Sequence, residues 1–162
     1  MKLRIAGIAD DSIVDGPGLR MTVFVQGCPH HCPGCHNPET HNFDGGMEKD
    51  TDEILGMMEE NPLLDGVTLS GGEPFCQSEA CAVLAKAAHE AGLNVWCYTG
   101  YTFEELTGGK AEWVALLKNV DVLVDGRFVL EKRTLECKWR GSSNQRLIDV
   151  KRSLAENSIV ES

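Results

Sequence analysis

Short apolar runs alternate with amphipathic segments along most of the chain. The β-rich runs 3–8, 21–25, 67–69, 93–98, 120–124 and 146–150 predict strands. Apolar residues three and four positions apart predict helices that include 54–58, 81–88 and 113–117. From residue 67 onward the strands recur roughly every 25 residues, which is the length of one strand–helix unit.

This alternation predicts an α/β fold with a mostly parallel sheet and helices outside it. A complete eight-fold (β/α) barrel takes about 250 residues. The present chain has 162 residues, so we expect a partial barrel that is open along one side. We treat 1–162 as a single domain, and we expect the polar segment 151–162 to fray or to dock on a partner.

Polar residues and glycine mark the expected helix ends. Asp50 with Glu53, and Thr102 with Glu105, have the spacing of a capping box at a helix start. Gly92 stands where a helix C-cap glycine is expected. These signals support the helices that the apolar periodicity predicts.

Composition limits the kinds of partner. The formal net charge is −10, and nucleic-acid binding needs clustered Lys and Arg, so we expect no nucleic-acid partner. No apolar run has the ~20 residues of a membrane-spanning helix.

The seven cysteines follow no export signal, which favours reduced thiols in a cytoplasmic protein over a disulfide framework. Ordinary core or surface roles are expected for Cys76, Cys81, Cys97 and Cys137.

Three cysteines follow the predicted strand 21–25 on one loop. Cys28, Cys32 and Cys35 are soft ligands close together in sequence, and they therefore indicate a metal site. A 4Fe–4S cluster needs a ligand on each iron, so three thiolates would leave one iron free to bind something else. The alternative is a structural zinc ion with a histidine as the fourth ligand. The candidate histidines are His30, His31, His36 and His41.

Two further loops directly follow predicted strands. The run 70–74, Ser-Gly-Gly-Glu-Pro, comes after strand 67–69, and its glycines would let backbone groups approach a ligand closely. Asp125 and Arg127 follow strand 120–124. In parallel α/β folds the carboxyl ends of the strands carry the chemistry. We therefore expect these loops to lie with the cysteine loop at one edge of the sheet.

The spacing of Cys28, Cys32 and Cys35, together with the Gly-Gly-Glu-Pro run, resembles the radical S-adenosylmethionine superfamily. The Asp-Gly-Pro-Gly-Leu-Arg run at 15–20 and the Gln-Gly pair before Cys28 are similar to the branch that activates glycyl-radical enzymes. Segments 125–128 and 140–146 fit the same branch, so the resemblance extends from residue 13 to residue 150. One departure is Gly34, because many members carry an aromatic residue there.

The resemblance implies that Cys28, Cys32 and Cys35 hold a 4Fe–4S cluster whose open iron is chelated by S-adenosylmethionine. Contacts with this cosubstrate are implied for Gly34, Cys35 and His36 at the nucleoside and for Ser70, Gly71, Gly72 and Glu73 at the methionine moiety. No catalytic side chain is implied beyond the cluster and the cosubstrate. Partner contacts are implied for Asp15, Gly16, Arg20, Asp125 and Arg127. A plain turn at 15–18 and a surface ion pair between Asp125 and Arg127 remain open as alternatives.

The implied reaction is reductive cleavage of S-adenosylmethionine to a 5′-deoxyadenosyl radical, which removes hydrogen from a glycine in another protein. The implied partners are an anaerobic ribonucleoside-triphosphate reductase as that protein and a flavodoxin-like electron donor. Two alternatives keep the radical chemistry: an activase of another glycyl-radical enzyme such as pyruvate formate-lyase, and a small-molecule enzyme such as a deazapurine synthase. The non-enzymatic alternative is an iron–sulfur electron carrier, which would need no Gly-Gly-Glu-Pro loop.

Overall fold

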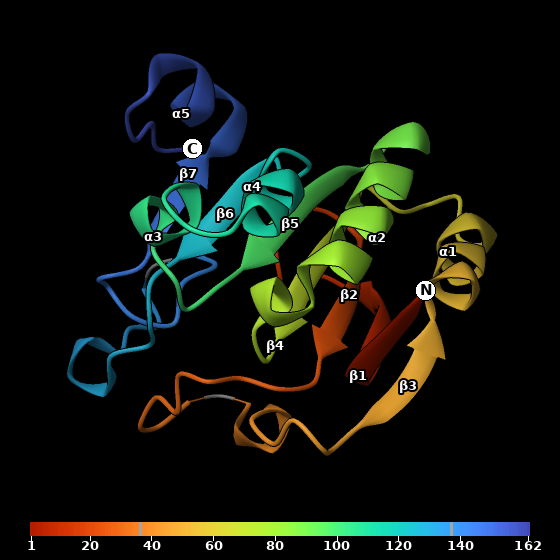
Figure 1. The fold of residues 1–162 in the computed structure, drawn as a ribbon, viewed down its shortest axis with the longest axis horizontal. Helices are drawn as coiled ribbons and strands as arrows, with labels where there is room; N and C mark the ends of the chain where they lie inside the picture. The colour runs from red at the N-terminus through yellow and green to blue at the C-terminus, as the bar shows by residue number, and fades with distance from the viewer. Residues whose placement is uncertain (36, 137) are drawn as a thin grey trace.

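The computed structural model describes residues 1–35, 37–136 and 138–162, and one seven-stranded sheet runs through them. Its strand order is β3-β1-β2-β4-β5-β6-β7 (Figure 1). The strands are β1 (Lys2–Ser12), β2 (Arg20–Val25), β3 (Met47–Asp50), β4 (Gly66–Gly71), β5 (Asn94–Tyr98), β6 (Val122–Asp125) and β7 (Arg146–Asp149). The helices are α1 (Thr51–Glu60), α2 (Ser78–Glu90), α3 (Phe103–Thr107), α4 (Ala111–Leu117) and α5 (Val150–Glu156). Short 3-10 turns are η1 (Pro38–Thr40), η2 (Pro74–Gln77) and η3 (Leu130–Lys132).

The centre of the sheet is parallel and both of its margins are antiparallel. Strands β2, β4, β5 and β6 pair in parallel, each with the next. β1 pairs antiparallel with both β2 and β3, and β7 pairs antiparallel with β6. The outer strands β3 and β7 do not pair with each other among the described residues. The expected α/β fold, a partial and open barrel with a mostly parallel centre, is therefore confirmed.

The antiparallel margins have a topological cause. A crossover between parallel neighbours needs a dozen or more residues, usually with a helix. Only residues 13–19 join β1 to β2, and the connection 126–145 between β6 and β7 contains no helix beyond the short turn η3 in its described part. Each of these two connections therefore returns its strand antiparallel, whereas the repeat of strand–helix units predicts a parallel last strand.

Strand β3 is not predicted by the sequence pattern. Its residues, Met-Glu-Lys-Asp, are all exposed or half-buried, so they show no alternation between apolar and polar positions. The strand is defined by its pairing along the edge of β1, from Lys2 opposite Asp50 to Ile5 opposite Met47. Main-chain pairing rather than side-chain burial therefore fixes this margin.

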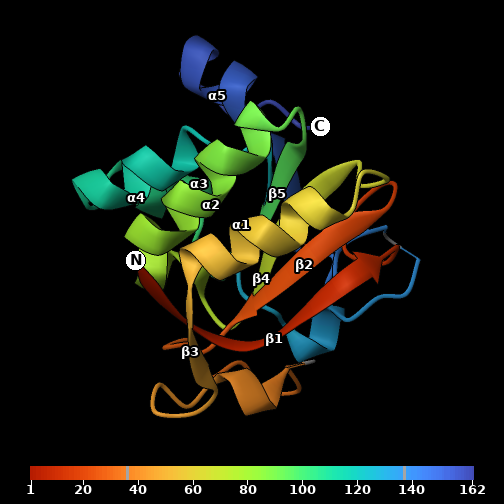
Figure 2. The ribbon, with the colours of Figure 1, turned by 90° about the vertical axis from the view of Figure 1, so that its right-hand side faces the viewer.

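Helices α1, α2 and α4 lie side by side on one face of the sheet (Figures 1 and 2). Helix α2 packs on β4 and β5 through completely buried residues that include Cys81 and Leu84. Cys81 and Cys97 are buried core residues and Cys76 is exposed, as expected, while Cys137 lies outside the described residues. No helix in the described ranges is both long enough and apolar enough to cross a membrane.

The helix ends follow the predicted signals with one local difference. Thr102 and Glu105 form a complete capping box at the start of α3, and Gly92 after α2 has φ +80°. At the start of α1, the Asp50 carboxylate accepts a hydrogen bond from the backbone N–H of Asp52 at 3.0 Å. Asp50 therefore caps the helix alone, without a reciprocal contact from Glu53.

The segment 151–162 is paired with the sheet rather than frayed. Its first half lies in α5, which ends at Glu156, and the next residue, Asn157, has the left-handed conformation. The chain then returns along β7, where the N–H of Asp149 donates to the carbonyl of Val160 at 2.8 Å and the N–H of Ser162 donates to the carbonyl of Leu147 at 2.9 Å. These are backbone hydrogen bonds, which the polar composition of the segment does not reveal.

Asp121 joins four elements at the amino-terminal end of β6. One carboxylate oxygen accepts a hydrogen bond from the N–H of Val95 at 2.8 Å and lies 2.7 Å from Nε2 of His89 in α2. The other oxygen lies 3.4 Å from Nζ of Lys151 in α5. Burial acts to raise the pKa of Asp121, but the hydrogen bonds from His89 and Val95 and the nearby cations outweigh it and hold the pKa below 3.8.

We predict that Asp121→Asn lowers the free energy of unfolding at pH 7 by about 1 to 2 kcal/mol, because these donors lose a charged acceptor. The folded-state pKa lies below the unfolded value of 3.8, so this contribution is present above that pH and is lost as the pH falls below it. The difference in unfolding free energy between wild type and variant should therefore shrink in acid. Anaerobic urea unfolding over a pH series measures it, and a difference that stays constant down to about pH 3 would contradict the assignment.

Candidate functional site

The carboxyl ends of the parallel strands surround a cavity of about 500 Å³. A residue that follows each strand lines it: Cys28 after β2, Gly72 after β4, Thr99 after β5 and Gly126 after β6. The β1–β2 loop contributes Asp15, and the segment 139–141 lines another part of the wall. The strand-end loops thus meet at one edge of the sheet, as the sequence pattern predicts.

The three clustered cysteines all line this cavity, and all three are free thiols. Cys28 is buried, while Cys32 and Cys35 are half-buried. Burial, together with the nearby acidic groups, raises the pKa of the Cys28 thiol to about 11. Cysteine binds a metal as the thiolate, so metal binding at Cys28 would displace its thiol proton.

Backbone hydrogen bonds hold the start of the cysteine loop between two other segments. The N–H of Gly27 donates to the carbonyl of Thr40 at 2.6 Å, and the N–H of Cys28 donates to the carbonyl of His41 at 3.2 Å. On the other side, the Gly27 carbonyl accepts from the N–H of Glu73 at 2.8 Å. These main-chain contacts join the start of the cysteine loop to the Gly-Gly-Glu-Pro loop.

The Gly-Gly-Glu-Pro loop presents only part of itself to the cavity. Ser70, Gly71 and Gly72 line the cavity, whereas Glu73 does not. Gly71 has φ +93°, and a Cβ atom on it would lie 2.6 Å from the backbone nitrogen of Val25. A Cβ atom on Gly72 would collide with the backbone of Gly27. The two glycines therefore allow close packing against the cysteine loop and leave backbone groups facing the cavity.

Glu73 is completely buried between the loops. Its carboxylate accepts hydrogen bonds from the hydroxyl of Thr99 at 2.7 Å and from the N–H of Gly100 at 2.8 Å. It also lies 2.6 Å from Nε2 of His30, a residue of the cysteine loop. This network connects the ends of β2, β4 and β5, and the sequence alone offers His30 only as a possible zinc ligand.

The expected nucleoside contacts are partly described. Cys35 lines the cavity, but Gly34 does not and is exposed. Gly34 has φ +74°, and a Cβ atom on it would lie 2.7 Å from Cδ1 of Leu130 in η3. The η3 turn thus occupies the space that an aromatic side chain at position 34 would need. His36 lies outside the described residues.

Arg20 is completely buried, so the structure corrects the expectation that its side chain contacts a partner. Its guanidinium donates to Thr68 Oγ1 at 2.8 Å, to the Asn94 side-chain oxygen at 2.6 Å and to the carbonyl of Pro17 at 2.9 Å. Burial lowers the pKa of Arg20 to about 10, outweighing the nearby acids. The side chain therefore fastens the 13–19 loop onto β4 and β5.

Asp15 and Gly16 of the same loop lie in different surroundings: Asp15 lines the cavity and Gly16 is buried beside Arg20. Asp15 lines the cavity, and its carboxylate accepts a hydrogen bond from the hydroxyl of Ser12 at 2.7 Å. Gly16 is buried with φ +133°, and a Cβ atom on it would lie 2.9 Å from Cδ of Arg20. Gly16 therefore lets the loop pass over the Arg20 side chain, while Asp15 remains on the cavity wall.

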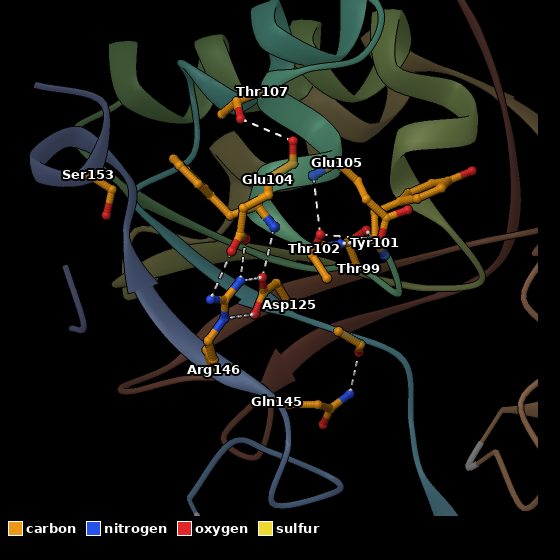
Figure 3. A network of polar contacts seen from close by, with 12 residues as sticks. Thr99, Tyr101, Thr102, Glu104, Glu105, Thr107, Asp125, Gln145, Arg146 and Ser153 are labelled. Carbon is orange, nitrogen blue, oxygen red and sulfur yellow. Dashed lines mark hydrogen bonds and ion pairs between the residues drawn. The ribbon is translucent and has the colours of Figure 1, made fainter. Parts of the chain in front are cut away.

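Asp125 pairs with Arg146 rather than with Arg127 (Figure 3). Asp125 is 1% exposed, and its carboxylate lies 2.6 Å from Nη2 of Arg146, which also lies 2.6 Å from Glu104. These two acids raise the pKa of Arg146. Arg127 is exposed and lies 3.8 Å from Glu105. The alternative of an Asp125–Arg127 ion pair is wrong, and Asp125 is too buried to offer its side chain to a partner.

Trp139 and Arg140 also line the cavity, and no sequence motif points to either as a site residue. Trp139 has φ +67°, a conformation that side-chain-bearing residues rarely adopt, and its ring packs edge-on against Trp96 with centroids 5.8 Å apart. The motif at 140–146 indicates that this segment belongs to the functional part of the chain. It does not show which side chain reaches the wall of the cavity, because that depends on the path of the long β6–β7 connection.

The cavity wall contains polar atoms that suit a polar ligand. Nε2 of His41 and Nε of Arg140 are buried without a hydrogen-bond partner within the described structure, and both residues line the cavity. Buried polar atoms are normally hydrogen-bonded, so these two fit a ligand that carries acceptor or anionic groups. Three thiols in the same cavity are a donor set that an iron–sulfur cluster takes. The residues present therefore fit a cluster together with a polar cosubstrate.

The geometry distinguishes among the histidines that the zinc alternative would use as a fourth ligand. Within the described ranges, no three His, Cys, Asp or Glu side chains are grouped so that they could hold a metal ion. His30 is engaged with Glu73, and the His31 ring packs edge-on against His41 at 5.8 Å. His30 is therefore engaged, whereas His41 lines the cavity with its Nε2 unpaired within the described structure.

Comparison with known proteins gives consistent matches over most of the chain. Residues 14–148 match the family model described as a 4Fe-4S single cluster domain. The anaerobic ribonucleoside-triphosphate reductase-activating protein of Salmonella typhi is 38% identical over 141 residues, which cover 82% of this chain and 90% of that protein. The proteins of the same name from Escherichia coli K12 (37% identical, 82% and 90% covered) and Enterobacteria phage T4 (36%, 83% and 86%) are similar. The crystal structure of QueE from Escherichia coli aligns with a TM-score of 0.48 at 14% identity, covering 77% of this chain and 70% of that one.

These matches bear directly on the cysteine loop and on the resemblance drawn from the motifs. The family model spans Cys28, Cys32 and Cys35 and describes a domain with one 4Fe–4S cluster, so the expected cofactor is confirmed. The relatives confirm the resemblance to an activating branch of enzymes. The chain belongs to the 4Fe-4S single cluster domain family and to the family of anaerobic ribonucleoside-triphosphate reductase-activating proteins.

Proposed function

We propose that this chain is a radical S-adenosylmethionine activase that generates a glycyl radical on an anaerobic (class III) ribonucleotide reductase. The observation that carries the proposal is the meeting of the three-cysteine loop with the backbone of Gly71 and Gly72 in one cavity. The names of the relatives support the reductase as the target over pyruvate formate-lyase, a deazapurine precursor or simple electron transfer. Residues 1–162 would act as one radical S-adenosylmethionine domain.

The chain's own residues would hold the cluster and the cosubstrate. Cys28, Cys32 and Cys35 would bind three irons, and the backbone of 70–72 would receive the methionine moiety. Arg140 would face the carboxylate of the cosubstrate, because its buried Nε has no partner within the described chain. The nucleoside would lie beside Cys35, with Gly34 and His36 as its expected neighbours. The chemistry that cluster and cosubstrate supply when bound is one-electron cleavage of the sulfonium to methionine and a 5′-deoxyadenosyl radical.

Apolar side chains would protect such a radical. Phe24, Phe128 and Trp139 line the cavity and would exclude water and other hydrogen donors. The target Cα hydrogen must come within near-attack distance, roughly 3 to 3.5 Å between reacting atoms. A glycine segment suits this approach because it has no side chain to exclude. The open margin of the sheet would let such a segment reach the strand ends.

The first contacts with the reductase would form beside the cavity. Ile13 and Val14 are 70% and 72% exposed, and Val14 also lines the cavity. Asp15 and the exposed Arg127 would add polar contacts, while Gly16, Arg20 and Asp125 would act by shaping the loops that carry them. A flavodoxin-like electron donor, a cytoplasmic location and the lack of nucleic-acid or membrane partners belong to the same proposal.

We predict that replacing any one of Cys28, Cys32 and Cys35 by Ala abolishes stable cluster binding, since each supplies one of only three protein ligands. Cys76→Ala is the matched control, because Cys76 is an exposed thiol that does not line the cavity. Anaerobic iron and sulfide analysis measures the cluster. A full cluster in one of the three variants, or wild-type activity with zinc alone, would contradict the assignment.

We predict that the reduced, cluster-loaded chain forms a glycyl radical when it is mixed without oxygen with S-adenosylmethionine and an anaerobic ribonucleotide reductase. Electron paramagnetic resonance detects the radical, and chromatography detects 5′-deoxyadenosine. The same mixture with Cys32→Ala in place of wild type is the control and should give neither product. Deoxyadenosine without a radical on a competent reductase would redirect the assignment to a small-molecule substrate.

A further inference from the structure

The structure assigns Glu73 and His30 to a positioning latch, meaning that their contact fixes the cysteine loop against the Gly-Gly-Glu-Pro loop. In this assignment, which rests on the proposed function, Glu73 does not itself bind the ammonium group of the cosubstrate. This differs from the role that the sequence resemblance implies for Glu73. The latch sets where the cysteines lie relative to the backbone that receives the methionine.

The Glu73 carboxylate has no capacity left for a ligand. One oxygen lies 2.6 Å from His30 Nε2 and accepts from the N–H of Gly100 at 2.8 Å. The other accepts from the Thr99 hydroxyl at 2.7 Å and from the N–H of Phe75 at 3.2 Å. A carboxylate offers about four acceptor sites, and all are used within the protein. Glu73 is also 0% exposed and does not line the cavity.

His30 lines the cavity, but its ring is held on the protein side by close packing. His30 lies between Cys28 and Cys32 in sequence, and its side chain is only 5% exposed. Its ring packs edge-on against Tyr101, with centroids 4.7 Å apart and planes at 77°. A Cβ atom on Gly100 would collide with the His30 ring, so glycine at this position makes room for it. The ring therefore occupies a fitted space at the end of β5.

The position of the latch explains how it would act on cosubstrate binding. His30 and Glu73 are 43 residues apart in sequence and belong to the two loops that would hold the cluster and the methionine. Groups that bind one ligand from two loops work only when the loops keep a fixed separation. Loss of the latch would therefore loosen the cysteine loop and weaken cosubstrate binding, although Glu73 does not line the cavity.

Two variants break the latch in different ways. His30→Ala removes the ring, and Gly100→Ala keeps the ring but adds a methyl group that displaces it. We predict that each accelerates amide hydrogen exchange at 28–35 in the cluster-free protein and weakens S-adenosylmethionine binding by the cluster-loaded protein about tenfold. His30→Gln, which keeps a donor within reach of Glu73, should recover most of both properties.

The double variant distinguishes a latch from two independent effects. The three atoms nearest to a Cβ on Gly100 all belong to the His30 ring, so Gly100→Ala should have no further effect on either measurement in a His30→Ala background. The matched control is His89→Ala, which removes a histidine–carboxylate contact of 2.7 Å with Asp121 at the opposite end of the strands. This control should leave both the 28–35 exchange rates and the cosubstrate affinity at wild-type values.

The latch is contradicted if His30→Ala changes neither measurement, or if Gly100→Ala weakens binding by the same factor with and without the His30 ring. If a variant fails to retain its cluster, the exchange rates of the cluster-free protein still decide the question. Neither measurement involves the reductase. A wild-type, cluster-loaded chain that does not bind S-adenosylmethionine would overturn the proposed function, while the exchange rates would still test the contact between the loops.

Discussion

The parallel pairing of β2, β4, β5 and β6 is the constraint on which the site depends. In-register pairing places Val25 of β2 directly opposite Gly71 of β4, so the cysteine loop and the Gly-Gly-Glu-Pro loop begin at the same height. The following strands bring Thr99 and Gly126 to the same edge. Helices α1, α2 and α4 cover one face of the sheet (Figures 1 and 2). At the carboxyl ends of the strands, four short segments from distant parts of the sequence line one cavity.

Buried polar groups then fix how these loops sit on the strands. An unpaired buried carboxylate or guanidinium is costly, so each such group must be fully hydrogen-bonded in the folded state. Glu73, Arg20 and Asp125 are at most 1% exposed, and each meets partners from other elements of the fold. These three residues connect the loops at the strand ends to one another and to the strands. Their burial is also the reason that Arg20 and Asp125 do not offer side chains to a partner.

The sequence predicts what is local and misses what depends on distant pairing. The cysteine loop, the glycine pair and the central strands are visible because their signals lie within a few residues of one another. The partners of Arg20 include Asn94, which is 74 residues away, and His30 meets Glu73 across 43 residues, so no short pattern reveals either contact. The hydrophobic pattern also does not predict strand β3, because its residues show no alternation between buried and exposed positions. Nor does it predict that β7 runs antiparallel to β6.

We propose that Cys28, Cys32 and Cys35 are the only protein ligands of the cluster and that the remaining iron is open to the cosubstrate in this cavity. Mössbauer spectroscopy of the chain reconstituted with ⁵⁷Fe, before and after anaerobic addition of S-adenosylmethionine, distinguishes the open iron from the other three. We expect one iron to change its isomer shift on addition while the other three do not. A spectrum that stays unchanged when the cosubstrate is shown to be bound, with all four irons retaining protein ligands, would contradict it.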